Sequence, residues 1–384
     1  FDNLLYCWGD DLDEKLGNGA ASGTRTPVEI GATDGSNMPV RFASVSVGEV
    51  TTCAVPVEPD GNSATSELYC WGRGDLFENG LDDTITPPPT PRTFDQPERV
   101  SWREDPMAGP PIRGVSLARD HGCALRGTKI YCWGAGNYGQ LGLGDYGTGT
   151  TLAGDNALVV PSPRRLKDVA GAVNGLDSQN FFAIATGTYH SCALNETEQL
   201  ACWGFAGNGR LADGKTGIEP FDGDSPSYAS PVVGVAPGRE HLCLHGANAT
   251  VFCFGSNFYQ QSPALSPPRQ IVTFSGQVDG KSTSSFTPDR VYAGERFTVV
   301  LSKGANSYVF AWGANGRSQV SPVPDPTLVL PAAHNTISPN YRDMVEPVTA
   351  GYAHVCGLEK QLTGDLVLSC WGDNSIGQLG SMKS

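Results

Sequence analysis

The chain has 384 residues, including 48 glycines and 28 prolines, and only 17% of its residues are charged. This composition favours many short strands joined by turns over long helices. The net charge of −14 and the lack of any Lys or Arg run argue against binding of nucleic acid or of an anionic membrane surface, and no stretch approaches the roughly 20 apolar residues that span a bilayer.

Along the chain, one predicted strand recurs with the pattern apolar-x-Cys-Trp-Gly. Successive copies lie 63, 62, 70, 51, 58 and 59 residues apart. Repetition at this period predicts a β-propeller built from similar blades. The seven copies centre on Cys7-Trp8-Gly9, Cys70-Trp71-Gly72, Cys132-Trp133-Gly134, Cys202-Trp203-Gly204, Cys253-Phe254-Gly255, Ala311-Trp312-Gly313 and Cys370-Trp371-Gly372.

Other motifs recur around this strand. A degenerate Gly-Gln-Leu-Gly follows it, most clearly at 139–142 and 377–380, and a Pro-x-x-apolar segment such as Pro27 to Ile30 comes next. A Gly-x-x-His-x-Cys-x-Leu motif precedes every copy except the first, as at 187–194 and 351–358. Each unit therefore offers three or four short strands, which is the content of one propeller blade.

These combined motifs resemble the regulator-of-chromosome-condensation repeat family, and the resemblance covers nearly the whole chain. It implies an all-β, seven-bladed propeller forming a single domain over 1–384, with a role in protein binding. The spacing is looser than the family's usual repeat, and the paired cysteines do not belong to the pattern of its nuclear members. The chain is therefore most similar to a secreted, disulfide-bearing branch.

Ten of the 11 cysteines form five pairs within repeats. If the members face each other across antiparallel hairpins, their Cα atoms lie within disulfide range. The tips then fall at Gly61-Asn62 and Gly127-Thr128 and around Thr197, Asn248 and Thr363. The predicted disulfides join Cys53 to Cys70, Cys123 to Cys132, Cys192 to Cys202, Cys243 to Cys253 and Cys356 to Cys370.

One repeat supplies an internal test of this pairing. It carries Val299 and Ala311 where the two cysteines should stand. Both partners are missing together, as expected of two halves of one bond. Metal binding is disfavoured because one pair cannot fill a tetrahedral site. Five disulfides indicate an oxidising compartment, so we expect an extracellular, secreted or cell-surface location.

Cys7 is left without a partner in the printed sequence. Its partner is expected upstream of Phe1, in another molecule, or nowhere, in which case the thiol is free. The first and last repeats are both expected to be incomplete, with complementary halves closing the ring. A neighbouring subunit that supplied the missing strands would instead produce a polymer.

The recurring histidines and aromatic residues are interpreted as structural. A catalytic or metal-binding histidine is needed once, whereas His121, His190, His241 and His354 share one repeat position, at which Thr51 and Phe297 also occur. The aromatic residues of the Cys-Trp-Gly strand are expected to pack between sheets: Trp8, Trp71, Trp133, Trp203, Phe254, Trp312 and Trp371. Trp102 lies outside the pattern, on an outer strand or as a surface anchor for a partner.

Two Asn-x-Thr sequons, at Asn195 and Asn248, fall at predicted hairpin tips and are candidate N-glycosylation sites. No cofactor is expected. Calcium remains a weak alternative in an acidic loop, although no segment meets the calcium-loop spacing. The acidic segments are Asp10-Asp11-x-Asp13, Asp60-Gly61-Asn62, Asp82-Asp83 and Asp222-x-Asp224.

Function is expected in inserted loops near 73–99, 142–160, 205–230, 256–288 and 314–343. They carry scattered aromatics: Phe94, Tyr146, Tyr228, Phe258 and Tyr259. No motif of a hydrolase, metalloprotease or phosphate-binding loop occurs. The sequence therefore favours a secreted, non-catalytic protein-binding or scaffold propeller, or alternatively a structural subunit of an extracellular filament. Nucleotide exchange and other enzymatic activity are disfavoured.

Overall fold

The computed structural model describes residues 3–20, 22–32, 40–57, 65–81, 92–102, 109–143, 159–166, 179–211, 218–219, 231–259, 261, 271–272, 276–278, 281–283, 287–303, 309–320, 344–360 and 363–380. These residues form short antiparallel strands, and no α-helix occurs among them. The chain divides into two compact units. The first comprises Phe1–Phe205, Ile218–Ser225 and Gly380–Met382, and the second comprises Ala206–Gly217, Pro226–Leu379 and Lys383–Ser384.

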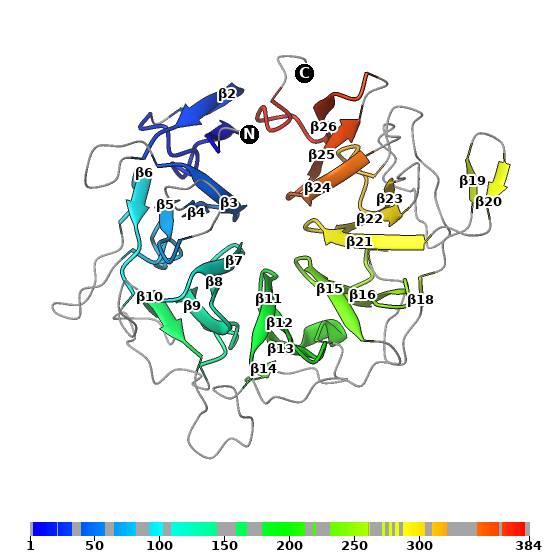
Figure 1. Ribbon diagram of the computed structural model, residues 1–384, viewed down its shortest axis with the longest axis horizontal. Coiled ribbons are helices and arrows are strands. Elements are labelled where there is room, and N and C mark those ends of the chain that lie inside the picture. Colours follow the sequence, from blue (N-terminus) through cyan, green and yellow to red (C-terminus); the bar gives the residue numbers. More distant parts are fainter. Residues whose placement is uncertain are drawn as a thin grey trace. The chain divides into compact units, whose positions relative to one another are not determined.

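The first unit holds four antiparallel sheets (Figure 1). The first sheet pairs β1 (Leu5–Gly9) with β2 (Thr24–Ile30), and each of the others has four strands. In chain order these are β3 (Phe42–Val47), β4 (Thr51–Pro56), β5 (Tyr69–Gly72) and β6 (Phe94–Arg99); β7 (Ile112–Leu117), β8 (His121–Arg126), β9 (Lys129–Ala135) and β10 (Val159–Arg165); and β11 (Phe181–Thr186), β12 (His190–Asn195), β13 (Leu200–Phe205) and β14 (Ile218–Glu219).

The second unit holds three sheets of the same kind and one small hairpin. It begins with a 3₁₀ turn, η1 (Gly207–Gly209), and the hairpin pairs β19 (Gly276–Val278) with β20 (Lys281–Thr283). The three sheets are β15 (Val232–Pro237), β16 (His241–Gly246), β17 (Val251–Gly255) and β18 (Ile271–Val272); β21 (Thr287–Ala293), β22 (Phe297–Lys303) and β23 (Val309–Gly313); and β24 (Met344–Ala350), β25 (His354–Lys360) and β26 (Leu366–Gly372).

Apart from the β1–β2 sheet and the β19–β20 hairpin, these sheets follow one plan, because each repeat places the same motifs on the same strands. The His-x-Cys motif begins the second strand, and Cys-Trp-Gly ends the third. Where a first strand is present, its register with the second shifts near its beginning, for example between Ile112 and Gly114. Such a bulge increases the local twist of a sheet. Six sheets carry a Cys-Trp-Gly-type copy on their third strand, and the remaining copy lies on β1 of the two-stranded sheet.

The glycine of Cys-Trp-Gly is required by the backbone. At Gly134 the φ angle is +93°, a region that side chains with a Cβ rarely occupy. A Cβ atom built there would lie 2.5 Å from the carbonyl oxygen of Asp120, in the turn before the second strand. The same conformation recurs at the corresponding glycines, including Gly72, Gly204 and Gly255, so the third strand passes too close to that turn for any larger residue.

The tryptophan explains the Gly-Gln-Leu-Gly motif of the preceding repeat. Trp203 is fully buried, and its Nε1 donates a hydrogen bond of 2.9 Å to the main-chain oxygen of Gln140. The side-chain oxygen of Gln140 accepts the N–H of Tyr138, which shapes the turn. Gly142 faces the indole, and a Cβ there would lie 2.8 Å from Trp203 Nε1. One turn therefore supplies both the hydrogen-bond acceptor and the space that the next tryptophan needs.

This tryptophan contact recurs along the chain. Equivalent Nε1 bonds run from Trp71 to Lys15, from Trp133 to Glu78, from Trp312 to Gln261 and from Trp371 to Gln319. In the first unit, Gly380 faces Trp8 in the manner in which Gly142 faces Trp203. The five tryptophans that make this bond thus contact the preceding repeat, whereas the packing of Phe254 between repeats stays a prediction.

The five cysteine pairs are disulfide-bonded, each between the second and third strands of one sheet. Their Cα atoms are 4.1 Å apart, and each pair stands directly opposite in the strand register. Val299 and Ala311 face each other at the same place in their sheet. The hairpin tip at Gly127-Thr128 is a two-residue turn with Gly127 at φ +59°, whereas Gly61-Asn62 lies outside the described residues.

The last sheet differs from the others in its third strand. The described parts of β5, β9 and β17 are almost entirely buried. In β26, by contrast, Leu366, Val367 and Leu368 are all exposed, each by about half of its surface. Among the described residues no fourth strand pairs with β26. That the chain folds as a single domain, with incomplete terminal repeats, stays a prediction.

Candidate protein-binding surface

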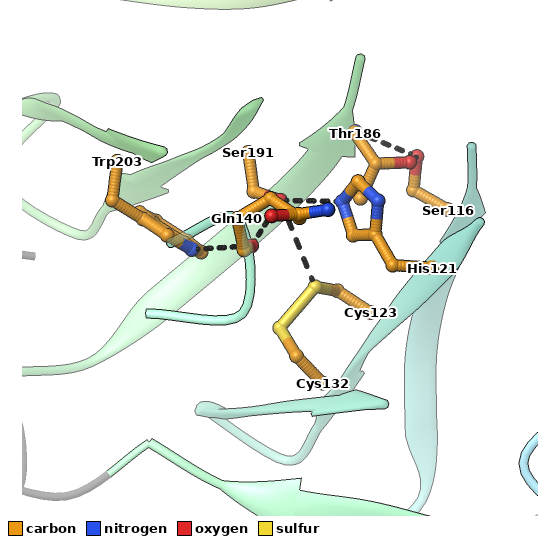
Figure 2. Close-up of a disulfide and its surroundings, with 8 residues drawn as sticks. All are labelled: Ser116, His121, Cys123, Cys132, Gln140, Thr186, Ser191 and Trp203. Atoms are coloured by element: carbon orange, nitrogen blue, oxygen red, sulfur yellow. Dashed lines mark hydrogen bonds between the residues drawn. A yellow bond between two sulfur atoms is a disulfide. The ribbon is translucent and has the colours of Figure 1, made fainter. Parts of the chain in front are cut away.

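The shared histidine position lies inside the sheets, between repeats. His121 is almost completely buried, and its Nε2 lies 2.9 Å from the hydroxyl of Ser191 in the next repeat (Figure 2). That hydroxyl also lies 2.9 Å from the carbonyl oxygen of Gln140, which can only accept. Ser191 therefore donates to Gln140 and His121 donates to Ser191, so Nε2 of this histidine carries a proton.

A second copy of this arrangement lies in the other unit. His241 Nε2 is 3.1 Å from the hydroxyl of Thr298, which donates to the main-chain oxygen of Gln261. Burial lowers the pKa of both His121 and His241 to about 3. A histidine without solvent contact and without charge at neutral pH is a poor acid or base. These contacts support a structural role for His121 and His241, and the same role for His190 and His354 stays a prediction.

Four exposed or partly exposed side chains of the second unit lie on the turns beside these strands. Phe258 and Tyr259 follow β17, Arg296 precedes β22 and Tyr352 precedes β25. Phe258 is 82% exposed and Tyr352 is 57% exposed. We refer to these four residues as the aromatic–arginine cluster.

The members of this cluster make specific contacts with one another. The rings of Phe258 and Tyr259 meet edge to face, with centroids 4.8 Å apart. The guanidinium of Arg296 lies 4.8 Å from the Tyr259 ring centre, and its Nη1 donates a 3.1 Å hydrogen bond to the tyrosine hydroxyl. Arg296 is thereby held in one place while more than a third of its side chain stays exposed.

A largely buried carboxylate joins the cluster to the neighbouring turns. Glu295 forms ion pairs with Arg239 at 2.5 Å and with Arg296 at 3.5 Å. Its main-chain N–H donates to Tyr352 O, and its own main-chain oxygen accepts from Arg239 N–H. Partial burial raises the pKa of Tyr352, and its hydrogen bond with Glu295 raises it further. The turns that carry the cluster are thus connected by both main-chain and side-chain bonds.

The first unit carries aromatic residues at two equivalent turn positions. The main-chain N–H of Tyr138 donates to the side-chain oxygen of Gln140, two residues later in the turn. Tyr259 makes the same bond to Gln261. Tyr138 packs edge to face against Tyr189, at 5.0 Å between ring centres, and lies 5.6 Å from Phe205. Tyr189 occupies the motif position that Arg296 occupies in the second unit. Both units therefore place a tyrosine against the next repeat's turn.

Charged residues occupy the corresponding turns elsewhere in the first unit. Arg73 contacts Asp13 at 3.7 Å, Glu78 at 2.9 Å and Asp120 at 3.7 Å, each from a different repeat turn. Burial raises the pKa of Glu78 despite its hydrogen bond with Arg73. This ion-pair network connects neighbouring turns of the first unit.

The acidic segments do not assemble a cation site where they are described. Asp10 and Asp13 contact Lys15, and Asp11 accepts the N–H of Leu16. No group of three or more His, Cys, Asp or Glu residues is placed to hold a metal ion in the described part of the chain. The segments at 60–62, 82–83 and 222–224 lie outside it.

Several other predicted positions are placed clearly by the structure. Cys7 is half-buried in β1, and burial, with a smaller contribution from Asp11, raises the pKa of its thiol to about 12.

Trp102 is buried and packs edge to face on Tyr131, with Arg126 4.6 Å from its ring. Its interpretation as a surface anchor is therefore wrong.

The two sequons differ in exposure. Asn248 is exposed, whereas only 7% of the Asn195 surface is exposed. The expectation that both hairpin-tip asparagines are accessible is therefore wrong for Asn195, because its side chain folds over the tip and bonds to it.

The loop prediction located part of the cluster and missed the rest. Phe258 and Tyr259 lie in the predicted loop near 256–288, and Phe94 lies in strand β6. Tyr146 and Tyr228 are outside the described residues. Arg296 and Tyr352 were missed because they occupy the variable positions of the Gly-x-x-His motif. The signal available was that these positions form the turn between the first and second strands.

No helix among the described residues is both long and apolar enough to cross a membrane.

Comparison with known proteins connects this geometry to a family. Residues 129–194 match the model of the regulator of chromosome condensation (RCC1) repeat. The chain is 25% identical to the ultraviolet-B receptor UVR8 of Arabidopsis thaliana, over 100% of this chain and 76% of the receptor. It is also 25% identical to the serine/threonine-protein kinase Nek9 of Xenopus laevis, over 84% of this chain but only 32% of the kinase.

Solved structures agree on the fold. Human WBSCR16 superposes with a TM-score of 0.70 at 17% identity, covering 98% of this chain and 90% of that one. Yeast RCC1 (Prp20), solved with Kap60 bound, superposes with a TM-score of 0.68 at 17% identity, covering 99% and 80%. Seven antiparallel sheets each carry one Cys-Trp-Gly-type strand, and the chain has the β-propeller fold of these RCC1-type structures.

Proposed function

We propose that this protein is a non-catalytic, secreted propeller that binds a protein partner through the aromatic–arginine cluster. The observation that carries the proposal is the exposure of Phe258, Tyr259, Arg296 and Tyr352 on adjoining turns of one compact unit. Tyrosine and arginine are enriched among the residues that dominate binding energy at protein interfaces, and exposed aromatic residues add contact area.

The internal bonding of the cluster supports this role. Arg296 is held by Tyr259 and Glu295, and Tyr352 by Glu295. A side chain that is already held in its binding geometry loses less conformational entropy when a partner docks. An interface built on these residues therefore begins from an ordered surface.

The similar proteins support a protein-binding role at a coarser level. UVR8 is a receptor by name, and yeast Prp20 has been solved with Kap60 bound and studied for its binding to Gsp1p and histones. These partners belong to those proteins. For this chain we infer only that the RCC1-type propeller serves as a platform for another protein.

Secretion is the second part of the proposal, and the disulfides support it. Five bonds join cysteines only 9 to 17 residues apart in the sequence. Disulfides of this number form and persist in oxidising compartments and are rare where thiols are kept reduced.

The test compares partners captured by the wild type and by a Phe258→Ala/Tyr352→Ala double variant. We expect at least one partner to bind the wild type and to be depleted on the order of tenfold with the double variant. Val233→Ala, at a half-exposed position of β15 in the same unit, is the matched control and should capture the same partner as the wild type.

Quantitative mass spectrometry of the captured proteins provides the readout, and circular dichroism verifies that each variant is folded. If the double variant and the wild type capture identical partners in equal amounts, the cluster is not the binding surface and the proposal fails.

A structural subunit of an extracellular assembly is the second candidate. The observation that favours it is the exposed apolar run Leu366–Leu368 on β26, with no strand paired beside it among the described residues. Such an edge invites pairing with another strand. Light scattering coupled to size exclusion decides between the candidates, because a discrete monomer at all concentrations would contradict an assembly subunit.

A further inference from the structure

The two sequon hairpins share one loop geometry, which permits a direct comparison. Residues 195–199 connect β12 to β13, and residues 246–250 connect β16 to β17. In each loop the N–H of the first residue donates to the carbonyl of the fifth, at 3.1 Å and 2.8 Å. The fourth residue, Glu198 or Ala249, has a φ angle of +60° in both.

The sequons occupy different places in this common loop. Asn195 is the first residue of its loop, where the main chain is still paired with the opposite strand. Its Oδ1 accepts from the N–H groups of Thr197 and Gln199 and from the Thr197 hydroxyl. Its Nδ2 donates to the side chain of Gln199 at 3.2 Å. Its carboxamide therefore folds back over the loop and contributes to its structure.

Asn248 is the third residue of its loop, at the apex, and is exposed. The hydroxyl of Thr250 lies 2.5 Å from its Oδ1, so the two functional groups of the sequon already face each other. Asn248 lies outside the strand pairing and is exposed, so a bulky substituent on it can be accommodated by solvent.

We propose that Asn248 is an N-linked glycosylation site and that Asn195, despite its sequon, is not. In the reaction, Nδ2 of Asn248 attacks C1 of an oligosaccharide carried on a lipid pyrophosphate. A C1–N bond forms as the C1–O bond breaks, the lipid pyrophosphate leaves, and the carboxamide loses one proton. The same substitution at Asn195 would force a glycan into the hydrogen-bonded loop and would remove the bond from Nδ2 to Gln199.

The position of Asn248 also determines which end of its sheet would carry the glycan. The hairpin tip follows β16, whereas the turn that includes Arg239 precedes this strand. Six residues of β16 separate the two ends, which is about 20 Å of extended chain. Because Arg239 is paired with Glu295 beside the aromatic–arginine cluster, the glycan would lie at the opposite end from the proposed binding surface.

This inference rests on the secreted location in the proposed function, so the test directs the full chain into a eukaryotic secretory pathway with an added signal peptide. The secreted wild-type protein is treated with a glycosidase in heavy-oxygen water, which marks each formerly glycosylated asparagine as a labelled aspartate. Peptide mapping should show the label at Asn248 and essentially none at Asn195.

Two variants complete the experiment. Thr250→Val keeps Asn248 but removes the sequon, and it should abolish the glycan-dependent mobility shift. Asn195→Gln should leave the shift unchanged in whatever protein is secreted. Label at Asn195 in the folded wild type, or an unmodified Asn248, would overturn the inference.

Failure here is separable from failure of the binding proposal. The glycan is mapped without any partner, whereas partner binding is measured with Phe258→Ala/Tyr352→Ala. Enzymatic removal of the glycan from the wild type should leave partner capture unchanged, because the two features lie at opposite ends of the strands.

Discussion

His241 shows how one buried side chain can make stability depend on pH. The unfolded histidine has a pKa near 6.5, whereas burial, helped by the nearby charge of Arg210, lowers the folded value to about 3. A lowered histidine pKa contributes stability that is present above pH 6.5 and is lost as the pH falls toward 3. Acid therefore unfolds the protein partly by charging residues that the fold holds neutral.

Replacing this histidine with the residue that another repeat uses tests the argument. Phe297 occupies the equivalent position and is fully buried. For His241→Phe, the loss of unfolding free energy between pH 7 and pH 4.5 should be about 2–3 kcal/mol smaller than for the wild type. At pH 7 the variant should lose about 1 kcal/mol with the Thr298 hydrogen bond.

Urea denaturation at the two pH values measures both effects. The reciprocal variant Phe297→His should steepen the dependence on pH. Equal pH dependence in His241→Phe and the wild type would show that this histidine does not control acid stability.

The disulfides differ in their exposure and should differ in their order of reduction. Cys356 and Cys370 are both partly exposed, on the sheet whose third strand is open. Cys123 and Cys132 are fully buried. Because the attacking thiolate must reach a sulfur atom, we expect Cys356–Cys370 to be reduced first.

Graded reduction followed by alkylation and peptide mass spectrometry measures this order. Alkylated Cys356 and Cys370 should accumulate while Cys123 and Cys132 remain unlabelled. Simultaneous labelling of all five pairs would instead mean that reduction follows global unfolding.

At the scale of the strand, the glycine of the Cys-Trp-Gly motif is the most restrictive position. Gly134→Ala would force a Cβ into a positive φ and to within 2.5 Å of the Asp120 carbonyl oxygen. We expect the variant to lose about 2 kcal/mol or more of unfolding free energy, measured by urea denaturation.

Gly114→Ala is the matched control in the same sheet. A Cβ there meets nothing within 4 Å, so the change should stay within about 0.5 kcal/mol. Equal stability of the two variants would contradict the proposed close approach between the third strand and the turn.

For the whole molecule, stability should depend on the state of all five disulfides together. Each bond closes a short loop within one sheet and contributes about 2–3 kcal/mol by restricting the unfolded chain. Complete reduction should therefore lower the thermal midpoint by on the order of 10 °C or more. Calorimetry with and without reductant measures the difference, and an unchanged midpoint would show that the bonds do not stabilise the fold.

The cysteine pairs, the hairpin registers and the repeat count could be predicted because they depend on residues close together in the chain. Cys123 and Cys132 are only nine residues apart. Once Gly127-Thr128 forms the turn, the register follows from the alternation of strand residues. The joint replacement by Val299 and Ala311 was visible in the sequence for the same reason.

The cluster and the accessible sequon were decided only by the tertiary structure. Arg296 and Tyr259 are 37 residues apart, and they meet because a turn of one repeat packs against a turn of the next. Asn195 and Asn248 carry the same motif, but only the loop geometry shows that the first side chain is buried in bonds across its loop and the second is exposed at its tip. Sequence alone determined a repeating, disulfide-bonded β-sheet protein, because local spacing specifies hairpins. Contacts between repeats decided which side chains are exposed. The exposure of a variable turn residue depends on how its turn packs against the next repeat, and this packing cannot be predicted from the neighbouring sequence.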